Sequence, residues 1–402
     1  MDRKKLLQYE KQYRGELLDN VVPFWMKHSP DRENGGYFHY LDRDGTVVDT
    51  DKYMWPECRE VWTFSMLYNS LERKPEWLDM AKLGIDFLQK YGRDENGDWY
   101  FVVDKTGRPV VQPYSIFSDC FAVMAFSEYA KATGRSEYLD IALKTYDRIQ
   151  ARKENPKGKY NKVVRENRAL RNLSFPMINI NMSVLMNKID PAPKYRLIIE
   201  QALKEIMTRF LDSEHRVIHE NIKPEGGYLD SADGRHINPG HGIETMWFVM
   251  QAAGELGDGA TVRKACEAAR WCLEFGWDKE YDGIYYFMDK FGKPHFELQW
   301  DMKLWWPHLE ALVALMLGYK MTRDEELFKW FEKVHEYTWA RFPDPQYGEW
   351  FGYLNRAGQV NNLCKGNRWK GPFHLPRALF LVSEIIQDCL KSENDENRQY
   401  RP

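Results

Sequence analysis

The sequence predicts a fold dominated by α-helices, an (α/α)6 barrel with short β-hairpins in the loops that connect the helices. A hairpin-like pattern recurs along the chain, segments of helical periodicity lie between its copies, and no change in composition marks a linker. We therefore expect residues 1–402 to form a single domain, with inner helices around a pocket and outer helices covering them. An open solenoid is the alternative, although the chain lacks the polar capping repeats that would favour one.

The recurring pattern combines glycine, aromatic residues and a turn. Its clearest copy, GGYFHYLDRDGTV at 35–47, has an alternating strand before the Asp44-Gly45 turn. Similar segments occur at 97–109, 283–294 and 348–358, and looser ones at 158–163 and 215–220. The copies start roughly 60 to 65 residues apart, a spacing that fits units of two helices and a hairpin.

The segments between these hairpins supply the helices of the predicted barrel. An amphipathic first helix is expected at about 2–24. Further helices are predicted at 117–133, 141–152, 195–210, 243–257, 261–275, 304–321 and 325–341. Two helices in each unit would form the inner and outer layers.

Composition and charge exclude several classes of protein. The chain has 402 residues, 43% hydrophobic and 29% charged, with a formal net charge of -3, so neither nucleic acid nor a membrane is expected as a partner. Its charged start lacks the apolar core of a signal peptide. No uncharged run approaches the roughly 18 residues of a membrane span, and we expect a cytoplasmic protein.

Cysteines, aromatic residues and missing motifs narrow the chemistry. The six cysteines include no CxxC pair, so neither a disulfide framework nor a zinc site is expected. Aromatic residues make up 15% of the chain; they can fill a core, but Trp and Tyr also form the walls on which sugar rings stack. Phosphate-loop, dinucleotide, HExxH and GxSxG motifs are absent from the sequence, which leaves cofactor-free acid–base chemistry or binding.

The segment NPGHGIE at 238–244 is the first candidate for a reaction centre. Asn238 suits an N-cap and Pro239 the first helical position, so His241 is expected in the first turn of a helix. There the helix dipole would disfavour the imidazolium ion and keep the ring neutral. Glu244 shares the helix face of His241, and the two glycines would leave room for a ligand. A capped helix with a structural histidine is the alternative.

Other candidates lie where predicted helices begin. Trp306 and Glu310 share a helix face in KLWWPHLE, and His374 follows a Gly-Pro turn in WKGPFH. Arg59 opens another helix, although Arg59 and Glu244 can also form a structural ion pair. In a ring of helix pairs the inner helices start at one mouth, so these residues can meet there. The other histidines are expected to be structural: His28, His39, His215, His219, His236, His295, His308 and His335.

These motifs, in this order and spacing, resemble the N-acylglucosamine 2-epimerase family. The likeness covers NPGHGIE, KLWWPHLE and WKGPFH and extends over essentially the whole chain. The resemblance implies an (α/α)6 barrel, a homodimer, and interconversion of N-acetylglucosamine and N-acetylmannosamine in sialic acid metabolism or N-acetylmannosamine salvage. It also implies a nucleotide such as ATP as an activator that is not consumed.

The resemblance further implies roles for residues at the motif positions. His374 is expected to abstract the C2 proton of N-acetylglucosamine, and His241 to return a proton to the opposite face of an enolate. Arg59 would stabilise the enolate oxygen. The other expected substrate-binding residues are Tyr114, Asn179, Glu244, Trp306, Glu310 and Trp369. No metal is expected, because no cluster in the sequence has ligand spacing.

Alternatives to this function remain open. Cellobiose 2-epimerases and mannose-type aldose–ketose isomerases place a further histidine in the middle inner helix, where this chain has Asn179. That departure favours the acylglucosamine branch. A glycoside hydrolase would need a carboxylate pair, for which Glu244 and Glu310 are candidates. A non-catalytic, renin-binding type of protein would not need both histidines.

A basic stretch at 152–171 carries eight Lys or Arg against two Glu. Within it, GKYNK resembles a GKxxK segment associated with nucleotide binding in bacterial members of the family. Lys159, Lys162, Arg165 and Arg168 are therefore expected to hold the phosphates of the nucleotide. An ordinary solvated loop is the alternative.

Overall fold

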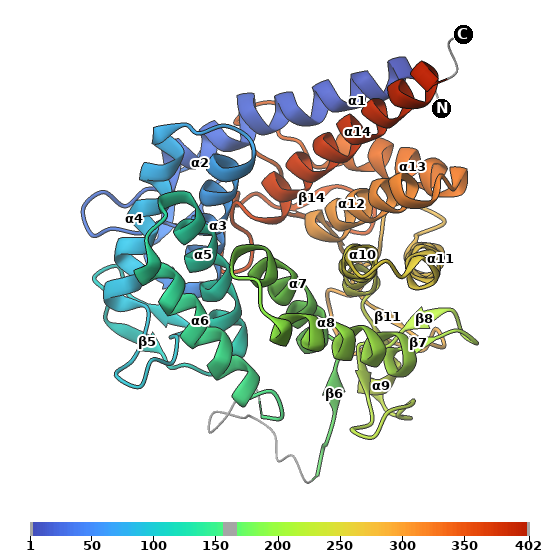
Figure 1. Cartoon of the computed structure of the whole chain (residues 1–402), viewed down its shortest axis with the longest axis horizontal. Helices are drawn as coiled ribbons and strands as arrows, with labels where there is room; N and C mark the ends of the chain where they lie inside the picture. Colours follow the sequence, from blue (N-terminus) through green and yellow to red (C-terminus); the bar gives the residue numbers. More distant parts are fainter. Residues whose placement is uncertain (1–2, 156–166, 400–402) are drawn as a thin grey trace.

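The structure, a computed structural model, describes residues 3–155 and 167–399, with side chains described as far as residue 391. Its helices form a ring of pairs, which confirms the predicted (α/α)6 barrel (Figure 1). The inner helices are α3 (Met54–Ser70), α5 (Ile116–Thr133), α7 (Ser174–Ile189), α10 (Pro239–Glu255), α12 (Trp305–Thr322) and α14 (His374–Gln399). In the same order, their outer partners are α4 (Pro75–Tyr91), α6 (Ser136–Ala151), α8 (Pro193–Glu205), α11 (Gly259–Gly276), α13 (Glu325–Arg341) and α1 (Arg3–Gly15).

The first helix of the chain is the outer partner of the last one. α1 packs along α14, so both ends of the chain lie at one edge of the barrel (Figure 1). α1 continues through a π-helical segment (Glu16–Val21) into α2 (Val22–His28), so the helix predicted at 2–24 is longer and less regular than expected. Just before α14, the ring of Phe373 lies 5.2 Å from the ring of Trp62 in α3, which brings the last inner helix next to the first.

Inner and outer helices differ in the pattern of their apolar residues. α12 buries residues all round its circumference, because other helices surround it. α13 instead buries one face, with Leu327, Phe331, Val334 and Tyr337 spaced three or four residues apart. No helix in the described ranges is both long enough and apolar enough to cross a lipid bilayer.

Short antiparallel strands lie in the loops that lead into the inner helices. The sheets are β1 (Tyr40–Leu41) with β2 (Val47–Asp49); β3 (Lys52–Tyr53), β4 (Val102–Val103) and β5 (Pro109–Val111); β6 (Arg171–Asn172) with β9 (Asn221–Ile222); β7 (Leu211–Asp212) with β8 (Val217–Ile218); β10 (His236–Ile237) with β11 (Met288–Asp289); and β12 (Lys303–Leu304), β13 (Tyr353–Leu354) and β14 (Val360–Asn362). A short helix α9 (Ala232–Arg235) precedes β10, and a π-helical segment (Ile206–Phe210) follows α8.

Most of the predicted hairpins are present, with shifted strands. The copies at 97–109 and 348–358 contain β4–β5 and the start of β13–β14, and β1–β2 forms around the Asp44-Gly45 turn. The prediction at 283–294 is wrong in detail, because β11 pairs with β10 from an earlier unit. The copy at 158–163 lies outside the described residues.

Ion pairs to buried aspartates tie these loops together at repeated positions. Each pair joins a lysine or arginine to the first aspartate of a loop, and we call the set the loop ion pairs. They are Lys52–Asp31, Lys303–Asp278 and Lys365–Asp344, each at 2.9 Å, with Arg43–Asp344 at 2.8 Å and Arg356–Asp278 at 3.0 Å. Arg43 and Arg356 come from other hairpins than the aspartates they bind, so the pairs connect neighbouring units.

Candidate active site

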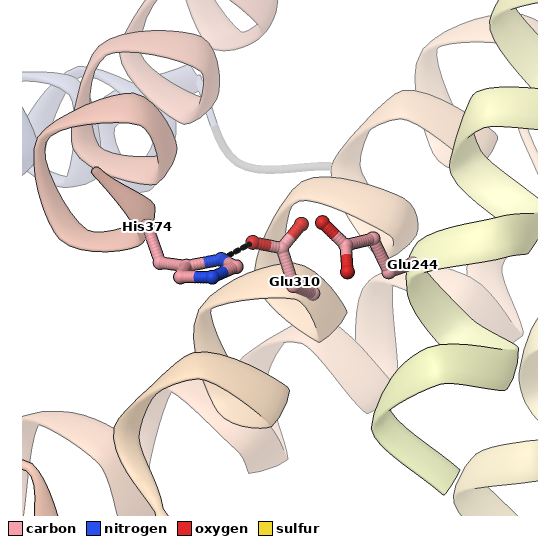
Figure 2. Close-up of side chains that lie close together, drawn as sticks. All are labelled: Glu244, Glu310 and His374. Atoms are coloured by element: carbon pink, nitrogen blue, oxygen red, sulfur yellow. Dashed lines mark hydrogen bonds and ion pairs between the residues drawn. The ribbon is translucent and has the colours of Figure 1, made fainter. Parts of the chain in front are cut away.

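Four polar side chains from three inner helices meet inside the barrel. His374 at the start of α14 places Nδ1 2.6 Å from Glu310 Oε1 of α12, and Glu244 of α10 lies next to them (Figure 2). Arg377 of α14 donates to Glu310 Oε1 at 2.6 Å and to Glu244 Oε1 at 2.7 Å. All four side chains are buried. The predicted meeting of His374, Glu310 and Glu244 is therefore present, but Arg377, which joins the two carboxylates, was not predicted.

The environment of His374 keeps its imidazole neutral. Burial lowers the pKa of His374 well below its usual value, and the positive charges of Arg377 and Arg59 lower it further, against an opposing contribution from Glu244. With Glu310 as acceptor, Nδ1 carries the hydrogen and Nε2 keeps its lone pair. Trp247 Nε1 donates to the other oxygen of Glu310 at 2.8 Å, which fixes the carboxylate. His374 is thus arranged as a base at Nε2.

His241 occupies the predicted place, but its pKa shifts in the direction opposite to the predicted one. Asn238 caps α10, and its side chain accepts a hydrogen bond from His241 N at 3.1 Å. His241 Nδ1 lies 3.0 Å from Glu220 Oε2. Burial acts to lower the pKa of His241, but the charge of Glu220 and the hydrogen bond to it outweigh burial, so the pKa is raised. The predicted downward shift of the pKa is therefore wrong, because the prediction weighed the helix dipole without a neighbouring carboxylate.

Glu220, like Arg377, is a residue of this site that sequence reasoning missed. It is buried between β8 and β9, and Asn172 Nδ2 of β6 donates to it at 3.3 Å. Burial alone would raise the pKa of Glu220, but the nearby His241 lowers it, so the carboxylate stays charged. Its position at the end of the hairpin pattern at 215–220 was visible in the sequence, but nothing local indicated that it faces His241.

Trp306 contacts both histidines. Its ring centroid is 5.2 Å from that of His241 and 5.8 Å from that of His374. The glycines that flank His241 make room for protein side chains and not for a ligand. A Cβ atom on Gly240 would lie 2.7 Å from Trp306 Cη2, and one on Gly242 would lie 2.7 Å from Cys272 Sγ. The expectation that these glycines leave space for a substrate is therefore wrong.

Arg59 faces the same region from α3. Its guanidinium carbon is 4.0 Å from the ring centroid of Phe121 and 4.8 Å from that of Phe373. Burial lowers the pKa of Arg59 to about 9, and the charge of Glu244 opposes this shift. Within the described ranges Arg59 Nε has no hydrogen-bond partner, and the ion pair of Glu244 is with Arg377. Arg59 therefore has donor capacity left for an anionic oxygen.

The remaining predicted substrate-binding residues separate into two groups. Trp369 is 45% exposed, and its ring lies 5.5 Å from Trp55 and 6.3 Å from Phe101, which in turn contacts Tyr114 at 4.7 Å. These rings form an aromatic wall. Asn179 is placed differently, because its Oδ1 accepts a hydrogen bond from Gln150 of outer helix α6 at 2.7 Å.

Most of the predicted nucleotide site lies outside the described residues, which exclude Lys159, Lys162 and Arg165. Arg168 is described, and it forms an exposed ion pair with Asp233 of α9. α9 leads through β10 into α10, which carries His241. Arg168 thereby connects the basic stretch to the segment before His241.

The prediction that no metal is required is not tested by the geometry alone. Glu244, Glu310 and His374 each offer a ligand atom, and these atoms lie within 4.8 Å of one another (Figure 2). Arg377, however, already donates to both carboxylates. A divalent cation would have to displace this guanidinium, so we assign the cluster to the ion pair.

Comparisons with known proteins agree with this geometry. A family model described as N-acylglucosamine 2-epimerase (GlcNAc 2-epimerase) matches residues 36–375. The N-acylglucosamine 2-epimerase of Rattus norvegicus is 38% identical over 397 residues, 96% of this chain and 94% of the rat protein. That of Bos taurus is 39% identical over 384 residues, 93% of this chain and 90% of the bovine protein.

A solved structure shares the fold at lower identity. The cellobiose 2-epimerase of Spirochaeta thermophila superposes with a TM-score of 0.82 at 20% identity, covering 96% of this chain and 99% of that chain. This likeness supports the barrel and carries no statement about the substrate.

Proposed function

The chain belongs to the N-acylglucosamine 2-epimerase family, and we propose that it interconverts N-acetyl-D-glucosamine and N-acetyl-D-mannosamine by inverting C2. One observation carries the proposal. Two histidines both contact Trp306, each with Nδ1 bound to a carboxylate, and their pKa values are shifted in opposite directions. One histidine is therefore ready to take a proton while the other is ready to give one.

Inversion at C2 requires such a pair. The sugar ring opens to the aldehyde, whose carbonyl acidifies the C2 hydrogen. Removal of that proton gives a planar enolate, and return of a proton to the opposite face gives the epimer. Two groups on opposite faces achieve this without turning the intermediate over, and each contributes general acid–base catalysis.

We assign proton abstraction from N-acetylglucosamine to His374 and reprotonation to His241. Neutral His374 receives the C2 proton at Nε2, and the positive charge that develops is stabilised by Glu310 at Nδ1. Protonated His241 delivers its Nε2 proton to the opposite face, while Glu220 holds Nδ1. In the reverse direction the two histidines exchange roles.

The negative charge of the enolate needs a cation nearby. Arg59 supports this role with its unpartnered Nε, since a preorganised donor stabilises charge that develops in the transition state. Arg377 is engaged with Glu244 and Glu310 and therefore acts as a positioning residue for His374. Trp306 and the wall around Trp369 would confine the sugar.

The proposal is tested by incubating the enzyme with N-acetylglucosamine in deuterated water and following the C2 position by NMR. We expect N-acetylmannosamine that carries deuterium at C2. A ketose product would instead identify an aldose–ketose isomerase, and turnover of cellobiose but not of N-acetylglucosamine would identify the other epimerase branch. Absence of any exchange would favour a non-catalytic binding protein.

Glycoside hydrolysis is less favoured by the same cluster. A hydrolase needs one carboxyl group to donate a proton and the other to act as nucleophile or base. Here both Glu244 and Glu310 accept hydrogen bonds from Arg377, so neither side chain is free to face a glycosidic bond without giving up this contact. Release of a free sugar from an aryl glycoside would overturn this assignment.

We further propose that ATP activates the enzyme without being consumed and that the enzyme is a homodimer. Phosphate groups would bind Lys159, Lys162, Arg165 and Arg168, and the ion pair of Arg168 with Asp233 gives a route toward α10. Replacing Lys159 and Lys162 together by Ala should weaken activation by ATP. An unchanged half-saturation concentration for ATP would mean that the nucleotide binds elsewhere.

The proposed homodimer is tested by analytical ultracentrifugation. We expect a mass of twice the chain, and a mass of one chain would contradict the proposal.

A further inference from the structure

His236, which the proposed mechanism does not use, lies beside the reacting histidine. It belongs to β10, two residues before the Asn238 cap of α10. Burial lowers the pKa of His236. A continuous series of ring contacts joins it to the reacting histidine: His236 to Phe287 at 4.7 Å, Phe287 to Tyr286 at 3.7 Å, Tyr286 to Trp306 at 6.3 Å and Trp306 to His241 at 5.2 Å. His236 was expected to be structural.

A chain of hydrogen bonds fixes the tautomer of His236. The backbone N–H of Glu297 donates to His295 Nδ1 at 2.9 Å, so that nitrogen must be the acceptor and Nε2 must carry the hydrogen. His295 Nε2 lies 3.0 Å from His236 Nδ1, which is then also an acceptor. His236 Nε2 therefore carries a hydrogen in the neutral ring. A main-chain amide can only donate, so the hydrogen bond from Glu297 sets the donor and acceptor of each following hydrogen bond.

Neighbouring rings also fix the orientation of both imidazoles. The ring of His295 lies parallel to that of Phe287, at 9° and 5.8 Å, and is stacked on Phe296 at 4.9 Å. Phe287 lies 4.7 Å from His236. Within residues 3–155 and 167–391, His236 Nε2 has no hydrogen-bond partner, and the residue is only partly buried. It is thus an oriented N–H donor that a ligand can reach.

We infer that His236 is a specificity residue that donates this hydrogen bond to the acyl carbonyl oxygen on the 2-amino group of the substrate. The inference rests on the proposed function. His241 acts at C2, the carbon that carries the acylamino group, so a donor beside His241 is well placed to meet that substituent. A carbonyl oxygen only accepts hydrogen bonds, and a nitrogen fixed as N–H only donates, so the two are complementary. A 2-hydroxy sugar lacks this acceptor.

The experiment compares N-acetylglucosamine with its N-thioacetyl analogue, whose sulfur is a poor acceptor. For the wild-type enzyme we expect a kcat/KM about tenfold lower on the thio sugar. His236→Leu should lower kcat/KM for N-acetylglucosamine by about tenfold, mainly through KM, with little further loss on the thio sugar. His236→Gln, which restores an N–H donor, should recover part of the loss. His28→Gln on α2, across the barrel, serves as the control.

A second variant leaves His236 in place and changes only which of its ring nitrogens carries the hydrogen. His295→Phe keeps the stack with Phe287 and Phe296 but removes the donor to His236 Nδ1, so the loss of discrimination should be smaller and of the same sign. Equal loss on both sugars in His236→Leu, or no loss in either variant, would overturn the inference. If the wild-type enzyme does not epimerise N-acetylglucosamine at all, the proposed function itself is wrong. If the wild-type enzyme is active but the His236 variants do not discriminate as expected, only the role of His236 is wrong.

Discussion

Two regions of the molecule bury charged groups: the loop ion pairs, and the central cluster formed by His374, Glu310, Glu244 and Arg377 together with the His241–Glu220 pair. They differ in whether every polar atom of the side chains has a partner within the protein. In the loop pairs, Lys52 contacts Asp31 at 2.9 Å and Lys303 contacts Asp278 at the same distance, with all of these side chains almost fully buried. In the central cluster, His374 and His241 form side-chain hydrogen bonds only through Nδ1 within the described ranges. Each thus leaves Nε2 without a partner.

This difference separates structural charge from functional charge. The loop pairs recur at equivalent places in several units, as the sequence repeats do, and each satisfies its own groups. Glu310, which Arg377 links to Glu244, holds His374, and Glu220 holds His241, and the second nitrogen of each histidine has no hydrogen-bond partner in the described ranges. In this molecule the repeated pairs are assigned to stability, and the pairs that leave a histidine nitrogen available are assigned to chemistry.

The largest expected effect is on turnover when either histidine is removed. His374→Ala and His241→Ala should each lower kcat by roughly 10³-fold or more, because general acid–base catalysis by one group contributes about 10² to 10⁴. Thermal unfolding should change little in comparison. Turnover within tenfold of the wild type in either variant would contradict the two-base assignment.

The loop pairs should respond in the opposite way. Lys52→Met leaves the buried carboxylate of Asp31 without its ion-pair partner and should lower the free energy of unfolding by about 3 to 5 kcal/mol. Activity per folded molecule should stay near that of the wild type. Lys82→Met, which breaks an exposed pair with Asp86, is the matched control and should cost less than about 1 kcal/mol. Similar denaturation midpoints for the two variants would refute the structural role.

A smaller effect is expected from the carboxylate that holds His241. In the direction from N-acetylglucosamine, activity requires neutral His374, whose pKa is lowered, and protonated His241, whose pKa is raised. Activity therefore falls at high pH as His241 loses its proton. Glu220→Gln removes the negative charge, so the high-pH limb of kcat/KM should move to lower pH, and kcat should fall by roughly 10- to 100-fold. An unchanged high-pH limb would show that loss of the proton from His241 does not cause the fall in activity at high pH.

Local signals made the barrel predictable from the sequence. The repeated Gly-aromatic segments and the helical periodicity fix the elements, and the N-cap at Asn238 places His241 correctly. Hairpin partners were less predictable, since β11 pairs with β10 from an earlier unit. The pairing of α1 with α14 could not be predicted from local sequence patterns either, because α14 lies at the other end of the chain.

The site was predictable only where its residues lie in the motifs. His374, Glu310 and Glu244 were found in this way, whereas the bond between Arg377 and Glu244 joins residues 133 positions apart. Glu220 is 21 residues from His241 and lies at the end of a loose copy of the hairpin pattern, outside the three motifs that contain the candidate catalytic residues. The charge state of His241 depends on this contact, and no helix-dipole argument could supply it.

The most direct test of the two-base account measures C2 hydrogen exchange in deuterated water for each single histidine variant with each sugar. His241→Ala, which retains His374, should exchange the C2 hydrogen of N-acetylglucosamine but not that of N-acetylmannosamine. His374→Ala should show the reverse, and neither should form the other epimer at an appreciable rate. Exchange of the same sugar by both variants would contradict the assignment of one histidine to each face of C2.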